Sequence, residues 1–154
     1  MNKAFVREPD EPPPRCPSPP GCGTSGEPIS RETLDAQLSR ADADRFPSGA
    51  FWCATPGCPI AYFDGWGTEV TAEALSGVPY PKNPGGLACS CLGIPPARIL
   101  EEAREDKRDA VLRIIAHARS DAAECVRKSP EGRSCERVVR QLFMQSRRAD
   151  ETSE

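Results

Sequence analysis

The sequence predicts an α+β fold in which a small loop-and-strand unit is followed by a short helical unit. Nearly all of the 17 Pro residues precede residue 97, and only Pro130 follows it. Aromatic residues between positions 51 and 63 indicate β-strands within this Pro-rich part. After Pro96, apolar side chains recur at helical spacing instead. The change of composition therefore separates a strand-forming part from a helix-forming part.

The same change divides the chain into four segments. Residues 1–15 and 146–154 are rich in charge, and the first is also rich in Pro, so both are expected to be disordered tails. Residues 16–84 form the predicted loop-and-strand unit, and residues 85–145 form the predicted helical unit.

Short elements are expected in the first unit. One helix is predicted over residues 30–38, with the hydroxyl of its first residue as the N-cap. Two strands are predicted over residues 46–53 and 60–64, on either side of a Thr-Pro-Gly turn. Val70 and Val78 are candidates for a third strand.

Three helices are expected in the second unit. Pro96 and its neighbour suit the first turn of a helix. A second helix is predicted over residues 108–125, and residues 129–132 break it. A third begins near Ser134, and its predicted buried face consists of Val138, Val139, Leu142 and Phe143.

Composition and charge exclude several protein classes. Hydrophobic residues make up 38% of the chain and aromatic residues 6%, so a large core is not expected, and bound metal can supply folding free energy instead. The net charge is −3 with both signs interleaved, which argues against nucleic-acid binding. No apolar run has signal-peptide or membrane-spanning length, so we expect a cytoplasmic protein without a membrane partner.

Eight cysteines are the strongest chemical signal. Because the cytosol is reducing, we expect them to be metal ligands, and a secreted scaffold with four disulfides is the alternative. They form four pairs along the chain: Cys16 with Cys22, Cys53 with Cys58, Cys89 with Cys91, and Cys125 with Cys135. The composition changes between the second and third pairs. Each unit therefore holds four thiols, the number that a tetrahedral zinc or one iron–sulfur cluster requires.

The residues around the first four cysteines favour metal-binding turns. Gly21 and Gly57 directly precede Cys22 and Cys58, and glycine permits the positive φ that such a turn requires. Two such turns beside aromatic strands resemble the layout of a zinc ribbon. Closed coordination by four thiolates in such a unit is structural.

Three of the last four cysteines lie close to predicted helix starts, and Cys125 lies at the end of the predicted second helix. Cys89-Ser90-Cys91 comes shortly before the first helix, and Cys135 begins the third. The N-terminus of a helix carries partial positive charge, which favours a metal cluster of net negative charge nearby.

These motifs resemble the N-terminal metal domain of CopZ-type copper chaperones, the family of the CopZ zinc-binding domain. The matching segments are Cys16-Pro17…Cys22-Gly23, Phe51-Trp52-Cys53…Cys58-Pro59-Ile60-Ala61-Tyr62-Phe63, Cys89-Ser90-Cys91-Leu92-Gly93-Ile94 and Cys125…Ser129-Pro130-Glu131-Gly132-Arg133-Ser134-Cys135. They extend over about residues 15–145. The second part also resembles the bacterioferritin-associated ferredoxin fold, a helical [2Fe-2S] module.

The resemblance implies two metal centres. Zinc is expected on Cys16, Cys22, Cys53 and Cys58, and a [2Fe-2S] cluster is expected on Cys89, Cys91, Cys125 and Cys135. The fold would then be a zinc-ribbon-like loop/strand unit followed by a short helical [2Fe-2S] unit. The implied function is one-electron transfer, or metallochaperone-like handling of copper or another soft metal ion, with a metal-transport protein or redox partner.

The chain departs from the chaperones in one respect. Their metal domain is joined to a copper domain with a Met-x-Cys-x-x-Cys loop, whereas this sequence has two Met and no C-x-x-C. We therefore do not expect this chain to deliver copper alone. A structural or interaction module with zinc in both sites is the alternative function, and a metal-responsive regulator is a third. The positive cluster that could contact nucleic acid or an acidic redox partner consists of Arg127, Lys128, Arg133, Arg137, Arg140, Arg147 and Arg148.

No catalytic site is predicted, so we expect that the protein is not an enzyme. His117 is the single histidine and is expected to be a surface or packing residue. Each cysteine is expected to be a ligand, so no pair of nucleophile and base remains. Trp52, Tyr62 and Phe63 are expected to pack around the metal turns.

Overall fold

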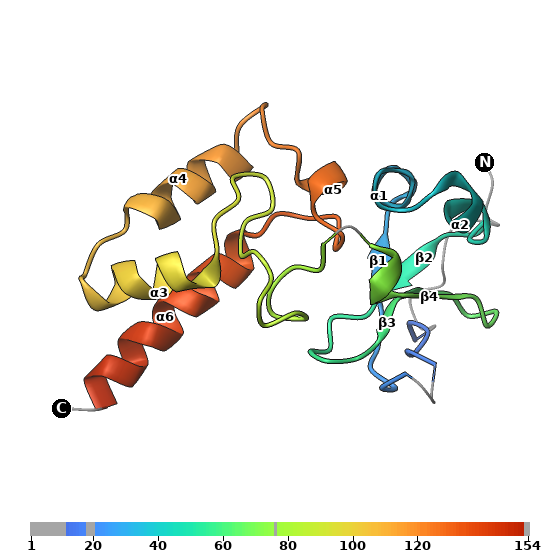
Figure 1. The fold of residues 1–154 in the computed structure, drawn as a ribbon, viewed down its shortest axis with the longest axis horizontal. Coiled ribbons are helices and arrows are strands. Elements are labelled where there is room, and N and C mark those ends of the chain that lie inside the picture. The colour runs from blue at the N-terminus through green and yellow to red at the C-terminus, as the bar shows by residue number, and fades with distance from the viewer. Residues whose placement is uncertain (1–11, 18–20, 76, 153–154) are drawn as a thin grey trace.

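The computed structural model describes residues 12–17, 21–75 and 77–152. Its first part is a four-stranded antiparallel sheet with strand order β1-β2-β3-β4. The strands are β1 (Glu27–Ile29), β2 (Ala50–Trp52), β3 (Ile60–Phe63) and β4 (Glu69–Thr71). Figure 1 shows this sheet at one end of the molecule with the helices α1 (Arg31–Gln37) and α2 (Arg40–Asp44) beside it. A short 3-10 helix, η2 (Ala72–Ala74), follows β4.

The second part contains four helices and no β-strand among its described residues. They are α3 (Pro96–Arg104), α4 (Asp109–Ala118), α5 (Cys125–Lys128) and α6 (Glu136–Thr152). In Figure 1, α3, α4 and α6 lie together at the end opposite the sheet, whereas α5 lies beside α1. None of the described helices is long and apolar enough to cross a bilayer.

Each part has its own buried core. In the strand unit, Leu34, Phe46, Trp52 and Tyr62 are almost fully buried, and the Trp52 and Tyr62 rings lie 5.5 Å apart across β2 and β3. A separate core in the helical unit joins α3, α4 and α6, and its most buried members are Ile99, Ile114 and Val139. The predicted apolar face of the last helix is buried, and Phe63 packs with Cys16, Cys53 and Cys58 as expected, whereas Trp52 and Tyr62 belong to the core of the sheet and α1.

Glu102 connects two helices of the second core. Its carboxylate is buried, and both of its oxygens accept a hydrogen bond from the backbone N–H of Ala110 at 2.9 Å. Ala110 lies in the first turn of α4, whose N-cap residue makes no side-chain capping bond. A carboxylate at this end of a helix also interacts favourably with the helix dipole. Glu102 therefore replaces the missing cap and fixes α4 against α3.

The α+β fold class is confirmed, and several element bounds are corrected. The predicted helix at 30–38 forms as α1, and the Ser30 hydroxyl accepts from the Thr33 N–H at 3.2 Å as expected. The strand predicted over 46–53 shrinks to β2, and β4 contains Val70 but not Val78. β1 and α2 were not predicted.

The helical unit also differs from the prediction at two boundaries. The predicted helix 108–125 ends at Ala118, because residues 119–124 are turn and loop and α5 starts separately at Cys125. The last helix continues through Thr152 instead of ending in a tail after residue 145, since no Gly or Pro interrupts it. Residues 1–11 of the predicted first tail lie outside the described residues. Its last residues are ordered, because Pro14 accepts from the Gly26 N–H at 3.0 Å.

Candidate metal centres

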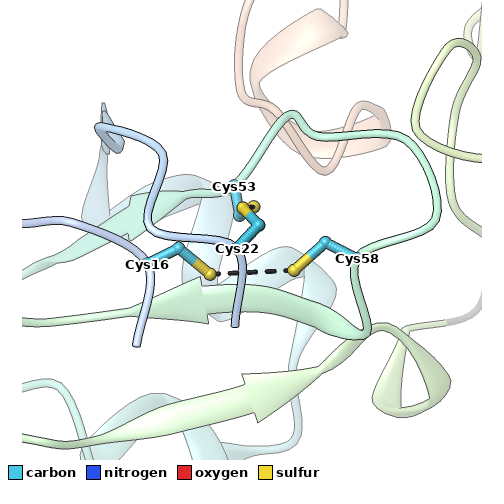
Figure 2. A group of neighbouring side chains, drawn as sticks. All are labelled: Cys16, Cys22, Cys53 and Cys58. Atoms are coloured by element: carbon cyan, nitrogen blue, oxygen red, sulfur yellow. Dashed lines mark hydrogen bonds between the residues drawn. The ribbon is translucent and has the colours of Figure 1, made fainter. Parts of the chain in front are cut away.

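Four thiols converge at one side of the sheet. The Sγ atoms of Cys16, Cys22, Cys53 and Cys58, called site 1 below, all lie within 4.8 Å of one another. Figure 2 shows that the side chains point toward one another; Cys16 and Cys58 are 3.7 Å apart, and Cys22 and Cys53 are 3.5 Å apart. A tetrahedral zinc with metal–sulfur bonds of about 2.3 Å requires edges of about 3.8 Å. The donor set and its dimensions therefore fit one zinc ion without an open coordination position.

Glycines bring the thiols of site 1 together. A Cβ atom on Gly21 would lie 1.4 Å from the carbonyl oxygen of Pro17 and 2.9 Å from the Cys16 sulfur, so no other residue fits the turn. Gly57 has φ of +77° in the turn that precedes Cys58. A left-handed conformation is accessible to glycine at little cost. The predicted positive φ is confirmed for Gly57, whereas Gly21 is required by close packing against Pro17 and not by a positive φ.

Hydrogen bonds and burial give thiols of site 1 different pKa values. Burial opposes ionisation of Cys22, but the hydroxyls of Thr24 at 3.2 Å and Thr55 at 3.1 Å lower its pKa to about 6. Burial raises the pKa of Cys16 and of Cys53. Thiolates are the metal-binding form of cysteine. Cys22, the exposed member of the group, therefore ionises more readily than Cys16 or Cys53.

A buried cation next to site 1 was not predicted. Lys82 is 4% exposed, its Nζ donates to the Thr55 carbonyl at 3.3 Å, and it lies 5.6 Å from the centre of the Trp52 ring. Burial raises the pKa of Cys53 and the charge of Lys82 lowers it. Four thiolates around a divalent ion carry excess negative charge, which Lys82 partly balances. The Pro-rich stretch around Lys82 carried no signal for this role.

The other four cysteines, called site 2 below, meet as two pairs. The Sγ atoms of Cys91 and Cys125 are 3.8 Å apart. An electrostatic interaction with Cys135 lowers the pKa of Cys89 to about 6, and the same interaction raises the pKa of Cys135. Burial, followed by the contact with Cys91, raises the pKa of Cys125 to about 11. Among the described residues, site 1 is the one group of three or more such ligands that converges on a single point.

The predicted positions of Cys89, Cys91 and Cys135 before helices agree with the structure, whereas Cys125, predicted at the end of the second helix, begins a separate short helix. Cys125 is the first residue of α5, and Cys135 directly precedes α6 and accepts from the Val139 N–H at 3.0 Å. Cys89 pairs with Ile94 through two backbone hydrogen bonds of 3.1 Å, which close a short loop before α3. Cys89, Cys125 and Cys135 are buried, and Cys91 is half-buried.

Two other candidates are placed by the structure. His117 lies in the last turn of α4, half-buried, and belongs to no convergent ligand group in the described part of the chain. Trp66, which the sequence analysis did not single out, is 86% exposed in the turn between β3 and β4.

Comparison with known proteins agrees with this geometry. Residues 14–76 match the sequence model of the CopZ family described as a zinc binding domain, and this range includes all four cysteines of site 1. Among solved structures, the chain is similar to the N-terminal domain of CopZ from Archaeoglobus fulgidus, with a TM-score of 0.66 and 22% sequence identity. The match covers 83% of this chain and 96% of that one. The search of curated proteins found no match. The resemblance to the CopZ N-terminal domain is thus confirmed, and the α+β fold is shared.

Proposed function

We propose that this protein is a metal-handling accessory protein with a structural zinc in site 1 and a [2Fe-2S] cluster in site 2. The observation that carries the second assignment is the contrast between the two sites. Four sulfur atoms within 4.8 Å of one another suit one ion, whereas in site 2 the Cys91 and Cys125 sulfur atoms are 3.8 Å apart and Cys89 interacts with Cys135, without convergence of the four on one point. In a [2Fe-2S] cluster, each of the two irons binds two of the four thiolates.

The pairing also supports the ligand assignment within site 2. One pair joins Cys91 to Cys125, and the other joins Cys89 to Cys135. Each pair therefore takes one thiol from the loop before α3 and one from the chain after α4. A cluster bound in this way would bridge the loop and the helices, and the 3.8 Å separation of Cys91 and Cys125 is suitable for two thiolates on one metal.

The residues around site 2 determine what such a site can do. A [2Fe-2S] cluster exchanges one electron at a time, and its potential depends on hydrogen bonds to sulfur and on solvent exposure. Cys89 is 1% exposed and Cys135 is 7% exposed, so the protein shields that pair from water. Cys91 is half-buried and supplies the edge nearest to solvent. We assign electron entry and exit to the Cys91 edge.

The handling of copper or another soft metal ion is the finer part of the proposal. Its support is the similarity to a domain of CopZ, together with two sites built from soft thiolate ligands. We further propose a cytoplasmic, non-enzymatic protein, since eight reduced thiols suit a reducing compartment and all have roles as ligands. A metal-transport protein or redox partner would receive the metal or the electron.

The positive residues near the last helix favour a protein partner over nucleic acid. Arg127 pairs with Glu32 at 2.8 Å, and Arg140 pairs with Glu136 at 2.9 Å. Lys128 pairs with Glu124 at 3.0 Å. These ion pairs reduce the positive field that phosphate binding would require.

Metal analysis of anaerobically purified protein tests the proposal. We expect two irons and one zinc per chain, red-brown colour and the electron paramagnetic resonance of a reduced [2Fe-2S] cluster. Cys89→Ser should remove or alter the visible bands and leave zinc in place, whereas the matched variant Cys16→Ser should weaken zinc binding. A colourless protein with two zincs and no iron would contradict the cluster and support the structural zinc module.

A further inference from the structure

The chain between two ligands of site 2 lies on the strand unit. We call residues 125–135, which begin with Cys125 and end with Cys135, the docking segment. Thr33 of α1 donates a hydrogen bond from its hydroxyl to the Val126 carbonyl at 2.7 Å. The Tyr62 hydroxyl on β3 donates to the Pro130 carbonyl. In Figure 1 the docking segment, with α5, extends from the helical unit to the side of α1.

The Tyr62 bond is buried at both ends, whereas the Thr33 bond is buried at its donor and Val126 is 38% exposed. Thr33 and Tyr62 are 0% exposed, and Pro130 is also fully buried. A buried carbonyl that loses its partner costs about as much free energy as desolvating the group, so each bond fixes the backbone that it contacts. Gly132 adds close packing, because a Cβ atom there would lie 2.7 Å from the Thr33 hydroxyl oxygen. The segment is therefore held at several points along its length.

The segment has little structure that could hold it by itself. α5 contains four residues, and a helix of this length is not stable without tertiary contacts. Ion pairs at the edge, such as Arg127 with Glu32 at 2.8 Å, are exposed and contribute little. The bonds from Thr33 and Tyr62 therefore fix the segment together with a bond from the Gln37 side chain to the Arg127 carbonyl and the ion pair of Arg133 with Glu27.

Both thiol pairs of site 2 depend on the position of this segment. Cys125 faces Cys91, and Cys135 faces Cys89. The segment therefore supplies one member of each pair, while the other members belong to the loop before α3. A shift of the segment would open both pairs together. In contrast, no ligand of site 1 lies within the segment.

We propose that Thr33 and Tyr62, which belong to the strand unit, are positioning residues for the metal centre at site 2. Their hydrogen bonds to Val126 and Pro130 hold Cys125 and Cys135 against their partners and slow the release of metal. The proposal rests on the proposed function only in that site 2 binds a metal; it holds for iron or for zinc.

The test compares metal protection at the two sites in the same sample. Metal-loaded full-length protein is kept anaerobic with a chelator and an alkylating reagent, and mass spectrometry follows alkylation of Cys125 and Cys135. Cys16 and Cys58 of site 1 are followed in parallel. Tyr62→Phe and Thr33→Val each remove one hydroxyl. Tyr80→Phe and Thr71→Val are the matched controls, because neither hydroxyl has a hydrogen bond among the described residues.

We expect Tyr62→Phe and Thr33→Val each to raise the alkylation rate of Cys125 and Cys135 about fivefold, the factor for one hydrogen bond. Cys16 and Cys58 should change less than about twofold. Thr33→Ser, which retains the hydroxyl, should restore slow alkylation, and the visible spectrum of iron-loaded Tyr62→Phe should shift.

Two results would overturn the proposal. Rates for Cys125 and Cys135 that match those of the control variants would mean that the hydroxyls do not position the site. An equal rise at Cys16 and Cys58 would mean a general loss of stability. Iron content is measured separately, and absence of iron would reject the proposed [2Fe-2S] cluster. The alkylation rates would still test the positioning role of Thr33 and Tyr62, whichever metal is bound.

Discussion

Gly132 offers a direct measure of how tightly the docking segment packs on α1. It has φ of +71°, and a Cβ atom at this position would lie 2.7 Å from the Thr33 hydroxyl oxygen and 3.3 Å from its methyl carbon. Gly67 provides the control, because its φ is +88° and nothing lies within 4 Å of an added Cβ. Both substitutions place alanine at positive φ, which costs free energy. Gly132→Ala also creates a steric clash, whereas Gly67→Ala does not.

The two costs can be estimated separately. Placing alanine in the left-handed region costs about 1–2 kcal/mol, so Gly67→Ala should destabilise the protein by that amount. Overpacking a buried contact adds about 1–3 kcal/mol. Thr33 cannot rotate away freely, because it is β-branched and its hydroxyl is bonded to the Val126 carbonyl. We therefore expect Gly132→Ala to lose about 2–5 kcal/mol of unfolding free energy.

Urea unfolding of metal-loaded protein, followed by circular dichroism at fixed metal concentration, measures both variants. The penalty of Gly132→Ala should also fall to that of Gly67→Ala in a Thr33→Ala background, since the clashing atoms are then absent. If Gly132→Ala and Gly67→Ala have the same unfolding free energy within about 0.5 kcal/mol, the close packing inferred between Gly132 and Thr33 is wrong.

Two further predictions concern charged groups. Lys82→Met removes the charge and retains the length of the side chain, so it should weaken zinc binding at site 1 about 10-fold or more. Competition with a chromophoric chelator measures the zinc affinity. An unchanged affinity would exclude the charge-balancing role of Lys82. Burial raises the pKa of Glu131 from 4.5 to about 6, so its ionisation destabilises the folded state as pH rises through this range. Glu131→Gln should therefore raise the unfolding free energy at pH 7 by at most about 2 kcal/mol, and by less at pH 5. Urea unfolding at both pH values measures the gain. An equal gain at both pH values would show that ionisation of the buried Glu131 carboxylate is not its cause.

The sequence was informative where chemistry and periodicity act locally. Gly57 could be recognised because a metal-binding turn needs positive φ, and the apolar spacing after Pro96 indicated α3 and α6. β1 was missed because three residues carry too little of the alternating pattern to be distinguished from loop.

The remaining features depend on contacts between distant parts of the chain. The partners of the Thr33 and Tyr62 hydrogen bonds lie 93 and 68 residues away, and no local pattern specifies such a pairing. Lys82 lies in a Pro-rich stretch that has the composition of a linker, and its burial follows only from the position of the Trp52 ring and the Thr55 carbonyl. The division of the site 2 thiols into two pairs is likewise a result of folding rather than of spacing.

The two centres should therefore differ in how each depends on the other. All four ligands of site 1 belong to the strand unit, so we expect zinc binding at site 1 not to depend on metal at site 2. Site 2 takes Cys125 and Cys135 from a segment that rests on α1 and β3 of the strand unit. Removing zinc should loosen that support, since metal binding contributes folding free energy in small thiolate sites.

The expected result is a one-way dependence that metal analysis can follow with time. Cys22→Ser, which weakens site 1, should accelerate loss of metal from both sites, whereas Cys91→Ser should empty site 2 and leave zinc affinity at site 1 within about twofold of the original. Equal, mutual loss in both variants would mean that the two units fold as one cooperative body. Independence in both variants would mean that the sheet keeps α1 and β3 in place without zinc, and that the docking segment needs the fold of the strand unit but not its metal.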